Sequence, residues 1–236
     1  MISTIPKWIG NLLEGALRPN ARVLKISLLS PQVKKIRFQG ELSKMNYQIG
    51  YANVIRVSET EYRNYTVAYH NAKEGIADIV FHVHGNSVGS DFIDCLTIGD
   101  EIYISSARGH KVYDPNVKTQ LVFGDETSLG LACSIYEVLK SNHHQFKFYF
   151  ELDDKNKAVP ELLRLENYTV FSKNGAFTNE EWIHDLPIFK TADWQAANYI
   201  LTGNVKSVQA FRRVLKNTTS GKVFSQGYWL EGKKGL

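Results

Sequence analysis

The sequence predicts two domains of different class, an antiparallel β-barrel followed by an α/β domain with a parallel sheet. Before Pro115 the chain consists of short β-branched or alternating runs bounded by Gly, Asn, Asp or Pro, which is typical of antiparallel strands. After Pro115, short apolar runs alternate with segments of helical spacing, which is typical of parallel strands joined by crossover helices. We therefore predict domains over residues 1–115 and 116–236.

Six strands are expected in the first domain, because each run is short and ends at a turn residue. They cover residues 23–29, 33–38, 52–57, 64–70, 78–84 and 100–105. One helix is expected between the last two, with Ser90 as its N-cap. Residues 1–17 read as an additional amphipathic helix rather than a signal peptide.

In the second domain, strands and helices are expected to alternate. The continuous apolar run 121–123 is typical of a buried parallel strand. The helix after it has apolar residues at helical spacing, and Pro160 suits the first turn of a further helix. The remaining strands are expected at 146–150, 168–171, 199–201 and 223–224, and the helices at 127–139, from residue 160, and at 205–215.

The composition is that of an ordinary folded protein. Of the 236 residues, 43% are apolar and 22% are charged, which excludes a disordered chain. No run approaches the ~18 apolar residues of a membrane span, so we expect no membrane insertion and a cytoplasmic location. With only Cys95 and Cys133, the chain cannot supply four thiolates to an iron–sulfur cluster or build a disulfide framework.

A first candidate ligand motif is Arg-Asn-Tyr-Thr at residues 63–66, at the start of a predicted strand. Alternate strand residues face the same side, so Arg63 and Tyr65 point one way and Thr66 the other. A guanidinium suits a phosphate and a phenol ring suits stacking on a heterocycle. The same letters also fit an ordinary strand with an exposed Arg and a half-buried Tyr.

A second candidate motif is the loop at residues 83–90, which ends one strand and opens a helix. Gly85 and Gly89 permit close backbone approach to a ligand, while His84 and Ser90 add polar side chains. The N–H groups at a helix start attract phosphate. Together the two motifs would hold both ends of a dinucleotide such as FAD.

The chain resembles the siderophore-interacting protein family, a flavin-dependent branch of the ferredoxin–NADP reductase superfamily. The matching residues are RNYT at 63–66, DIVFHVHG at 78–85, Gly99-Asp100, GDETSL at 124–129 and GYWLEG at 227–232. They occur in the family's order over about residues 20–232. Family members usually carry Pro-Ala before the Ser of the helix, where this chain has Val88-Gly89.

The resemblance implies a six-stranded flavin-binding barrel, non-covalent FAD and reduction of Fe(III) held in a ferric siderophore. It assigns Arg63 to the flavin phosphate, Tyr65 to the isoalloxazine ring, and Thr66 to the vicinity of N5. It places His84, Gly85, Gly89 and Ser90 around the pyrophosphate. Because the flavin carries the redox chemistry, no catalytic acid or base and no metal site are expected in the protein.

The resemblance implies NAD(P)H or a ferredoxin as the electron donor, since members of the family are expected to use one or the other, and the residues leave both open. The turn Gly124, Asp125, Glu126 and Thr127 follows the first strand of the α/β domain, where a nicotinamide donor would bind. Its two carboxylates are poor neighbours for a pyrophosphate, and they also fit simple turn and capping roles.

The charge is uneven along the chain. Residues 201–236 hold seven Lys and Arg against a single Glu, a local charge of +6 in a protein of net charge +4. Lys206, Arg212 and Arg213 are candidates for receiving an anionic ferric chelate, a ferredoxin or a phosphate. A solvated helix face explains the pattern equally well, and we expect no nucleic-acid partner.

The residues leave three questions open: the role of Trp229, the role of two histidines, and the overall function. Trp229 is either a core anchor or a lid beside the flavin, and the neighbouring His82 and His84 contact the flavin or clasp an ion. A flavin- or siderophore-binding protein without turnover, and a flavin reductase acting on another small acceptor, are the alternatives to a ferric-siderophore reductase.

Overall fold

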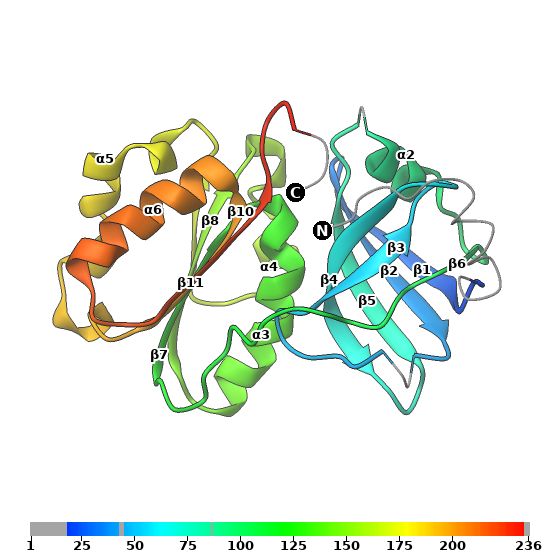
Figure 1. The fold of residues 1–236 in the computed structure, drawn as a ribbon, viewed down its shortest axis with the longest axis horizontal. Coiled ribbons are helices and arrows are strands. Elements are labelled where there is room, and N and C mark those ends of the chain that lie inside the picture. The colour runs from blue at the N-terminus through cyan, green and yellow to red at the C-terminus, as the bar shows by residue number, and fades with distance from the viewer. Residues whose placement is uncertain (1–17, 43–44, 86, 234–236) are drawn as a thin grey trace. The chain divides into compact units, whose positions relative to one another are not determined.

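The computed structural model describes residues 18–42, 45–85 and 87–233. The amphipathic helix expected at residues 1–17 lies outside the described residues. The contacts divide the described residues into two compact units, one ending at Lys111 and the other beginning at Val112 (Figure 1). Each unit has its own hydrophobic core.

The first unit is a six-stranded antiparallel barrel, as the alternation predicted. Its strands are β1 (Ala21–Ser30), β2 (Val33–Gly40), β3 (Ala52–Arg56), β4 (Tyr62–Asn71), β5 (Ile76–His82) and β6 (Glu101–Ile102). They pair in the order β3-β4-β5-β2-β1-β6. Inward-facing Ile36, Phe38, Ile79 and Phe81 fill the core because alternate strand residues point to one side.

The barrel closes through the segment after β6. Ile104 forms an isolated antiparallel bridge with Ile55 of β3, and the N–H of Ser105 donates to the carbonyl of Val54 at 2.9 Å. The strand expected over 100–105 is therefore only two residues long and then passes to the other edge of the sheet. Helix α2 (Val88–Cys95) contributes Ile93 to the barrel core.

The second unit is a five-stranded, fully parallel sheet. Its strands are β7 (Thr119–Gly124), β8 (Gln145–Leu152), β9 (Tyr168–Ser172), β10 (Asn198–Asn204) and β11 (Val223–Trp229), in the order β11-β10-β7-β8-β9. The predicted apolar run in β7 is buried on both faces, since Leu121, Val122 and Phe123 are all at most 1% exposed.

Helices cover both faces of this sheet (Figure 1). One face packs on α6 (Val205–Thr218) and α5 (Glu180–His184), where Phe123, Phe177 and Phe211 meet. The other packs on α3 (Leu129–Ser141), whose Tyr136 contacts the ring of Phe148. The short α4 (Val159–Leu162) has Pro in its first turn, as predicted. Short 3₁₀ turns cover Glu126–Ser128, Asp154–Asn156, Ala176–Thr178, Pro187–Phe189 and Ala192–Trp194.

Two sequence expectations about helix starts are wrong. Ser90 is not the N-cap of α2: Ser87 is, with its side chain accepting from the N–H of Ser90. The helix expected from Thr127 begins at Leu129, because residues 126–128 form a 3₁₀ turn capped by Asp125. At α2 a polar residue slightly earlier in the chain takes the cap, whereas at α3 the side-chain cap belongs to the preceding 3₁₀ turn and the N-cap Ser128 makes no side-chain capping hydrogen bond.

Candidate functional site

The first unit brings three of the predicted FAD-binding residues together. A Cβ placed on Gly89 would lie 2.9 Å from Cγ of Arg63 and 3.2 Å from the hydroxyl oxygen of Tyr65. The first turn of α2 therefore lies directly against the side chains of Arg63 and Tyr65 on β4. The first N–H groups of a helix have no partner inside the helix and attract anions, so this corner places a guanidinium beside an anion-binding helix start.

Tyr65 is fixed between the barrel core and the start of α2. Its ring packs edge-on against Phe81, with ring centroids 4.7 Å apart. Burial raises the pKa of the Tyr65 phenol to about 12, although the charge of Arg63 acts in the opposite direction. The phenol is therefore neutral at any physiological pH and presents a hydroxyl beside Gly89.

The loop before α2 is held by its own serines. Gly85 has φ of +70°, a conformation that glycine adopts without strain, and its N–H donates to Oγ of Ser90 at 2.9 Å. Ser90 is buried, so its hydroxyl shapes the loop from inside. His84 is exposed, and its ring centroid lies 5.4 Å from that of His82.

Arg63 already has an anionic partner in its own unit. Its Nη2 lies 3.0 Å from Oε1 of Glu61, and its Nη1 donates to the carbonyl of Tyr62. Sequence reasoning did not single out Glu61, although a carboxylate two residues from Arg63 on an extended segment is a readable signal. A phosphate at Arg63 would share the guanidinium with this carboxylate.

Thr66 is placed apart from the other predicted FAD residues. It pairs with Ala52 across β3 and β4 and is half-buried, and its side chain is on the opposite face of β4 from Arg63 and Tyr65, as strand alternation predicts.

In the second unit, Asp125 lies at the carboxyl end of β7 and is almost fully buried. Its Oδ1 accepts from the N–H of Thr127 at 2.9 Å, and its Oδ2 accepts from the N–H of Asn204 at 2.9 Å and from Nε1 of Trp229 at 2.6 Å. The carboxylate thus joins the ends of β7, β10 and β11. Trp229 is an anchor of the second unit through this bond.

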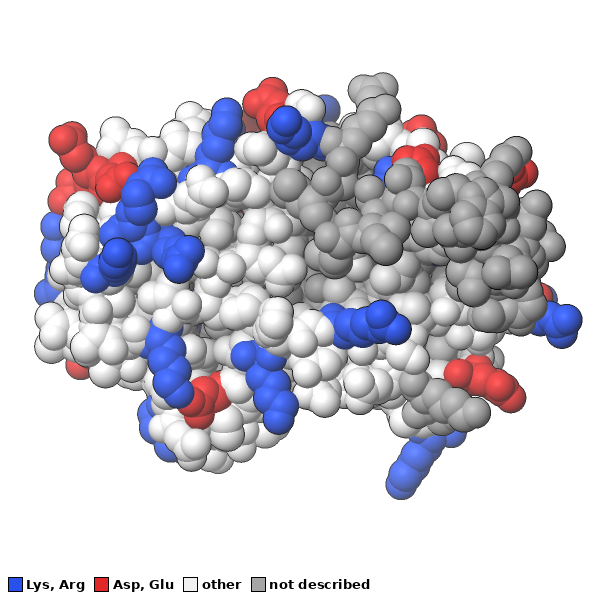
Figure 2. Space-filling model, in the orientation of Figure 1, with Lys and Arg blue, Asp and Glu red and all other residues white. Residues whose placement is uncertain are grey.

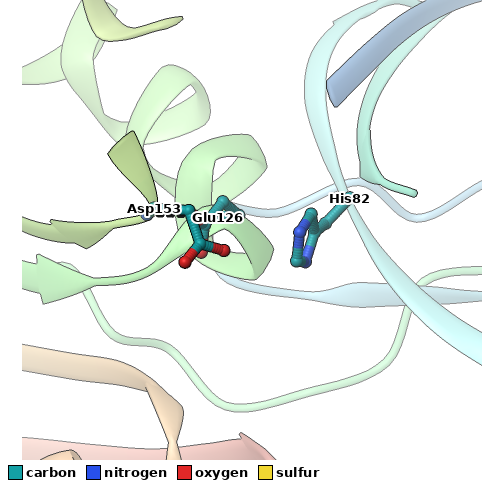
Figure 3. Close-up of side chains that lie close together, drawn as sticks. All are labelled: His82, Glu126 and Asp153. Atoms are coloured by element: carbon teal, nitrogen blue, oxygen red, sulfur yellow. Dashed lines mark hydrogen bonds between the residues drawn. The ribbon is translucent and has the colours of Figure 1, made fainter. Parts of the chain in front are cut away.

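Glu126 is fully buried and forms a second polar centre at the same edge. Its Oε1 accepts from the N–H of Asp153, the bond drawn in Figure 3, and from Nδ2 of Asn156, while Oε2 lies 2.5 Å from Nζ of Lys173. Burial alone would raise the pKa of this carboxyl. The Lys173 charge and these hydrogen bonds outweigh burial and hold the pKa below its usual range.

Lys173 links the two polar centres. Burial would lower the pKa of its ammonium, but Glu126 and Asp125 raise it above the usual value. Its Nζ also lies 5.3 Å from the ring centroid of Trp229, within cation–π range. No periodicity or motif marks Lys173 in the sequence, because its importance comes only from the meeting of β7, β9 and β11.

The other two residues of the predicted donor turn have packing roles. A Cβ on Gly124 would lie 2.2 Å from Cβ of Ser128, so only glycine permits this close return of the chain. Thr127 donates both its N–H and its hydroxyl to Asp125. The four residues of the turn are thus brought together, mainly around carboxylates that are already hydrogen-bonded.

The predicted cationic residues lie on α6 and are all exposed. Lys206 and Arg213 are seven residues apart and share one helix face. Arg213 pairs with Glu180 of α5 at 2.5 Å, while Arg212 projects from a different face. Figure 2 shows Lys and Arg side chains gathered over the part of the second unit where α6 lies in Figure 1.

Residues 20–113 match the family model described as the oxidoreductase FAD-binding domain. This chain contains an FAD-binding oxidoreductase domain. The matched residues include β4, α2 and the corner formed by Arg63, Tyr65 and Gly89. No curated protein sequence matches the chain.

Solved structures share the fold over most of the chain. The siderophore-interacting protein from Acinetobacter baumannii has a TM-score of 0.72 at 18% identity, over 92% of this chain and 92% of its own. The siderophore-interacting protein SipS from Aeromonas hydrophila has a TM-score of 0.71 at 19% identity, over 91% and 99%. Phthalate dioxygenase reductase has a TM-score of 0.71 at 13% identity, over 94% and 70%.

These likenesses confirm the resemblance predicted from the motifs at the level of the fold, a flavin-type barrel followed by a parallel α/β domain. Among the described residues, no helix combines the length and the apolar character needed to cross a membrane.

Proposed function

We propose that this protein is an FAD-dependent oxidoreductase that reduces Fe(III) in a ferric siderophore and releases Fe(II). One observation carries the FAD assignment: the start of α2 lies against the side chains of Arg63 and Tyr65, and a Cβ on Gly89 would lie 2.9 Å from Cγ of Arg63. This cradle is part of the segment that matches the FAD-binding domain model.

The residues present fit FAD. The guanidinium of Arg63 and the N–H groups at the start of α2 would hold the pyrophosphate, and Tyr65 would pack beside the isoalloxazine ring. A bound flavin takes up two electrons together and delivers them singly, which suits two one-electron reductions of Fe(III). The chain's own residues would bind and orient the FAD. Tyr65, whose phenol is neutral, would contribute a hydroxyl and a ring to this site but no charge.

The substrate side of the proposal rests on the fold shared with siderophore-interacting proteins and on the exposed cations of α6. Lys206 and Arg212 would attract an anionic ferric chelate, and Arg213 would contribute less because Glu180 already neutralises it. The electron donor in this proposal is NAD(P)H or a ferredoxin, and the reaction belongs in the cytoplasm.

Three measurements test the proposal. Purified protein titrated with FAD should quench flavin fluorescence and develop a bound-flavin spectrum. After anaerobic reduction with dithionite and removal of the excess, a ferric hydroxamate or catecholate should restore the oxidised flavin band. A colour-forming ferrous chelator should then capture two Fe(II) per flavin.

Two arginines of the same barrel provide a matched control. Arg63→Ala should weaken FAD binding about 10- to 100-fold, the effect of losing charge-assisted hydrogen bonds to a phosphate. Arg56→Ala should leave FAD binding within about twofold, since Arg56 donates to the carbonyls of Ser58 and Glu59.

The results separate the alternatives. A protein that takes up no FAD contradicts the proposal at its first step. FAD uptake with no reoxidation by any ferric chelate would favour a binding protein without turnover. Faster reoxidation by free flavin or a quinone than by ferric chelates would favour a reductase for another small acceptor.

A further inference from the structure

The parallel sheet of the second unit has its topological switch point between β7 and β10. From β7 the chain runs through α3 to β8, and from β10 it runs through α6 to β11 on the opposite side. In open parallel sheets of this kind, the crevice outside the carboxyl ends of the two central strands is where dinucleotides bind. Their pyrophosphate accepts hydrogen bonds from N–H groups at the adjoining helix starts.

The donors that such a pyrophosphate would use are present at this edge. The N–H of Thr127 lies in the turn after β7, and the N–H of Asn204 lies at the N-cap of α6. The indole Nε1 of Trp229 approaches from the end of β11. All three point at one place, which is the carboxylate of Asp125.

Asp125 occupies that place completely. Its oxygens accept from the N–H and the hydroxyl of Thr127, from the N–H of Asn204 and from Nε1 of Trp229, at 2.5–2.9 Å. Asp125 is only 2% exposed. The chain fits closely around it: Gly203 has φ of +106°, and a Cβ there would lie 2.7 Å from the Asp125 carboxyl carbon.

A pyrophosphate at this edge would find the hydrogen-bond donors already occupied by the Asp125 carboxylate, which is negatively charged like the pyrophosphate itself. It would have to displace a buried carboxylate and leave that charge unpaired, which is strongly unfavourable. Glu126 lies beside Asp125 in the chain and is also buried, and Lys173 is already paired with it. In the first unit, by contrast, the start of α2 is bordered by Gly89 and Arg63.

We infer that Asp125 is a specificity-determining residue that takes the place of a dinucleotide pyrophosphate and closes the switch point to NADH and NADPH. The inference rests on the proposed function, because it narrows the electron donor of that reaction. The electron donor is therefore a reduced carrier that places no pyrophosphate in this crevice.

Equilibrium binding of ADP-ribose, NADH and NADPH to the FAD-loaded protein tests this, with calorimetry as the readout. The wild type should show no binding below about 1 mM ligand. Asp125→Gly frees the three donors and the space, and should bind ADP-ribose at least tenfold more tightly than the wild type. Asp125→Ser is the second variant, used if the glycine variant does not show a cooperative urea transition.

Asp153→Ser is the matched control. It removes an acidic side chain at the end of β8, on the same edge of the sheet, and should leave ADP-ribose binding unchanged because this carboxylate takes none of the three donors. Inorganic pyrophosphate should raise the unfolding temperature of the Asp125 variant and not that of the control.

Three results would overturn the inference. The first is ADP-ribose or NAD(P)H binding to the wild type with a Kd below about 100 µM. The second is a folded Asp125 variant that gains no affinity, and the third is an equal gain in Asp153→Ser. None of these depends on iron or on turnover, so failure of the ferric-chelate assay and failure of this inference are separate results.

Discussion

Glu126→Gln should destabilise the second unit by about 2–3 kcal/mol at neutral pH. The carboxylate of Glu126 is fully buried and accepts from Asp153, Asn156 and Lys173. The glutamine keeps the shape and can still accept at Oε1, but it removes the carboxylate closest to the Lys173 ammonium and leaves the more distant Asp153, at 4.0 Å, and Asp125. Removing one partner of a buried ion pair costs about 3–5 kcal/mol, and the expected loss lies at or slightly below the lower end of that range because Lys173 is 21% exposed and water reaches it.

The pH dependence follows from the two shifted pKa values. The pKa of Glu126 is lowered in the folded state, so its contribution is present above its unfolded pKa and is lost as pH falls through the folded pKa. The pKa of Lys173 is raised, so its contribution is present below its unfolded pKa and is lost as pH rises through the folded pKa. The stability gap between wild type and variant should therefore narrow below about pH 4 and again above about pH 10.

Urea unfolding followed by tryptophan fluorescence measures this gap. Three of the four tryptophans, Trp182, Trp194 and Trp229, belong to the second unit, so the signal reports that unit. Asp154→Asn is the control: it breaks an exposed pair with Lys157 and should cost less than about 0.5 kcal/mol. A Glu126→Gln protein as stable as the wild type, or a gap that does not change with pH, would refute the reasoning.

Three further predictions concern the start of α2, beside Arg63, and the start of α6, beside Asp125. Glu61→Gln should tighten FAD binding about two- to fivefold, since it frees the Arg63 guanidinium from a partly exposed ion pair; flavin fluorescence titration checks it, and weaker binding would contradict it. Gly89→Ala should weaken FAD binding at least about fivefold in the same titration, because the new methyl would lie 2.9 Å from Arg63 Cγ; unchanged affinity would show that the corner does not hold the cofactor. Gly203→Ala should cost about 2–4 kcal/mol by urea unfolding, from its positive φ and the contact with Asp125, and a loss under 0.5 kcal/mol would be inconsistent with that packing.

Strand alternation and helical spacing were sufficient to predict the two fold classes. Most strands were placed to within a few residues, because burial on one or both faces leaves a period in the sequence. Errors came at helix starts, where Ser87 rather than Ser90 caps α2, and where a 3₁₀ turn capped by Asp125 delays the start of α3. Capping depends on the backbone angle at which the chain enters the helix, and several nearby polar residues offer the same chemistry.

The sequence alone also grouped the candidate FAD residues, since Arg63 and Tyr65 alternate on a strand and Gly89 lies in the loop that opens a predicted helix. The meaning of Asp125 was decided only by the tertiary structure. From the sequence it was an acidic residue in a turn, but folding brings the N–H of Asn204 and the indole of Trp229 to it from 79 and 104 residues away. The local periodicity of the sequence indicates which side chains face the core. The hydrogen-bond donors that reach a buried carboxylate such as Asp125 depend instead on the order in which the parallel strands pair.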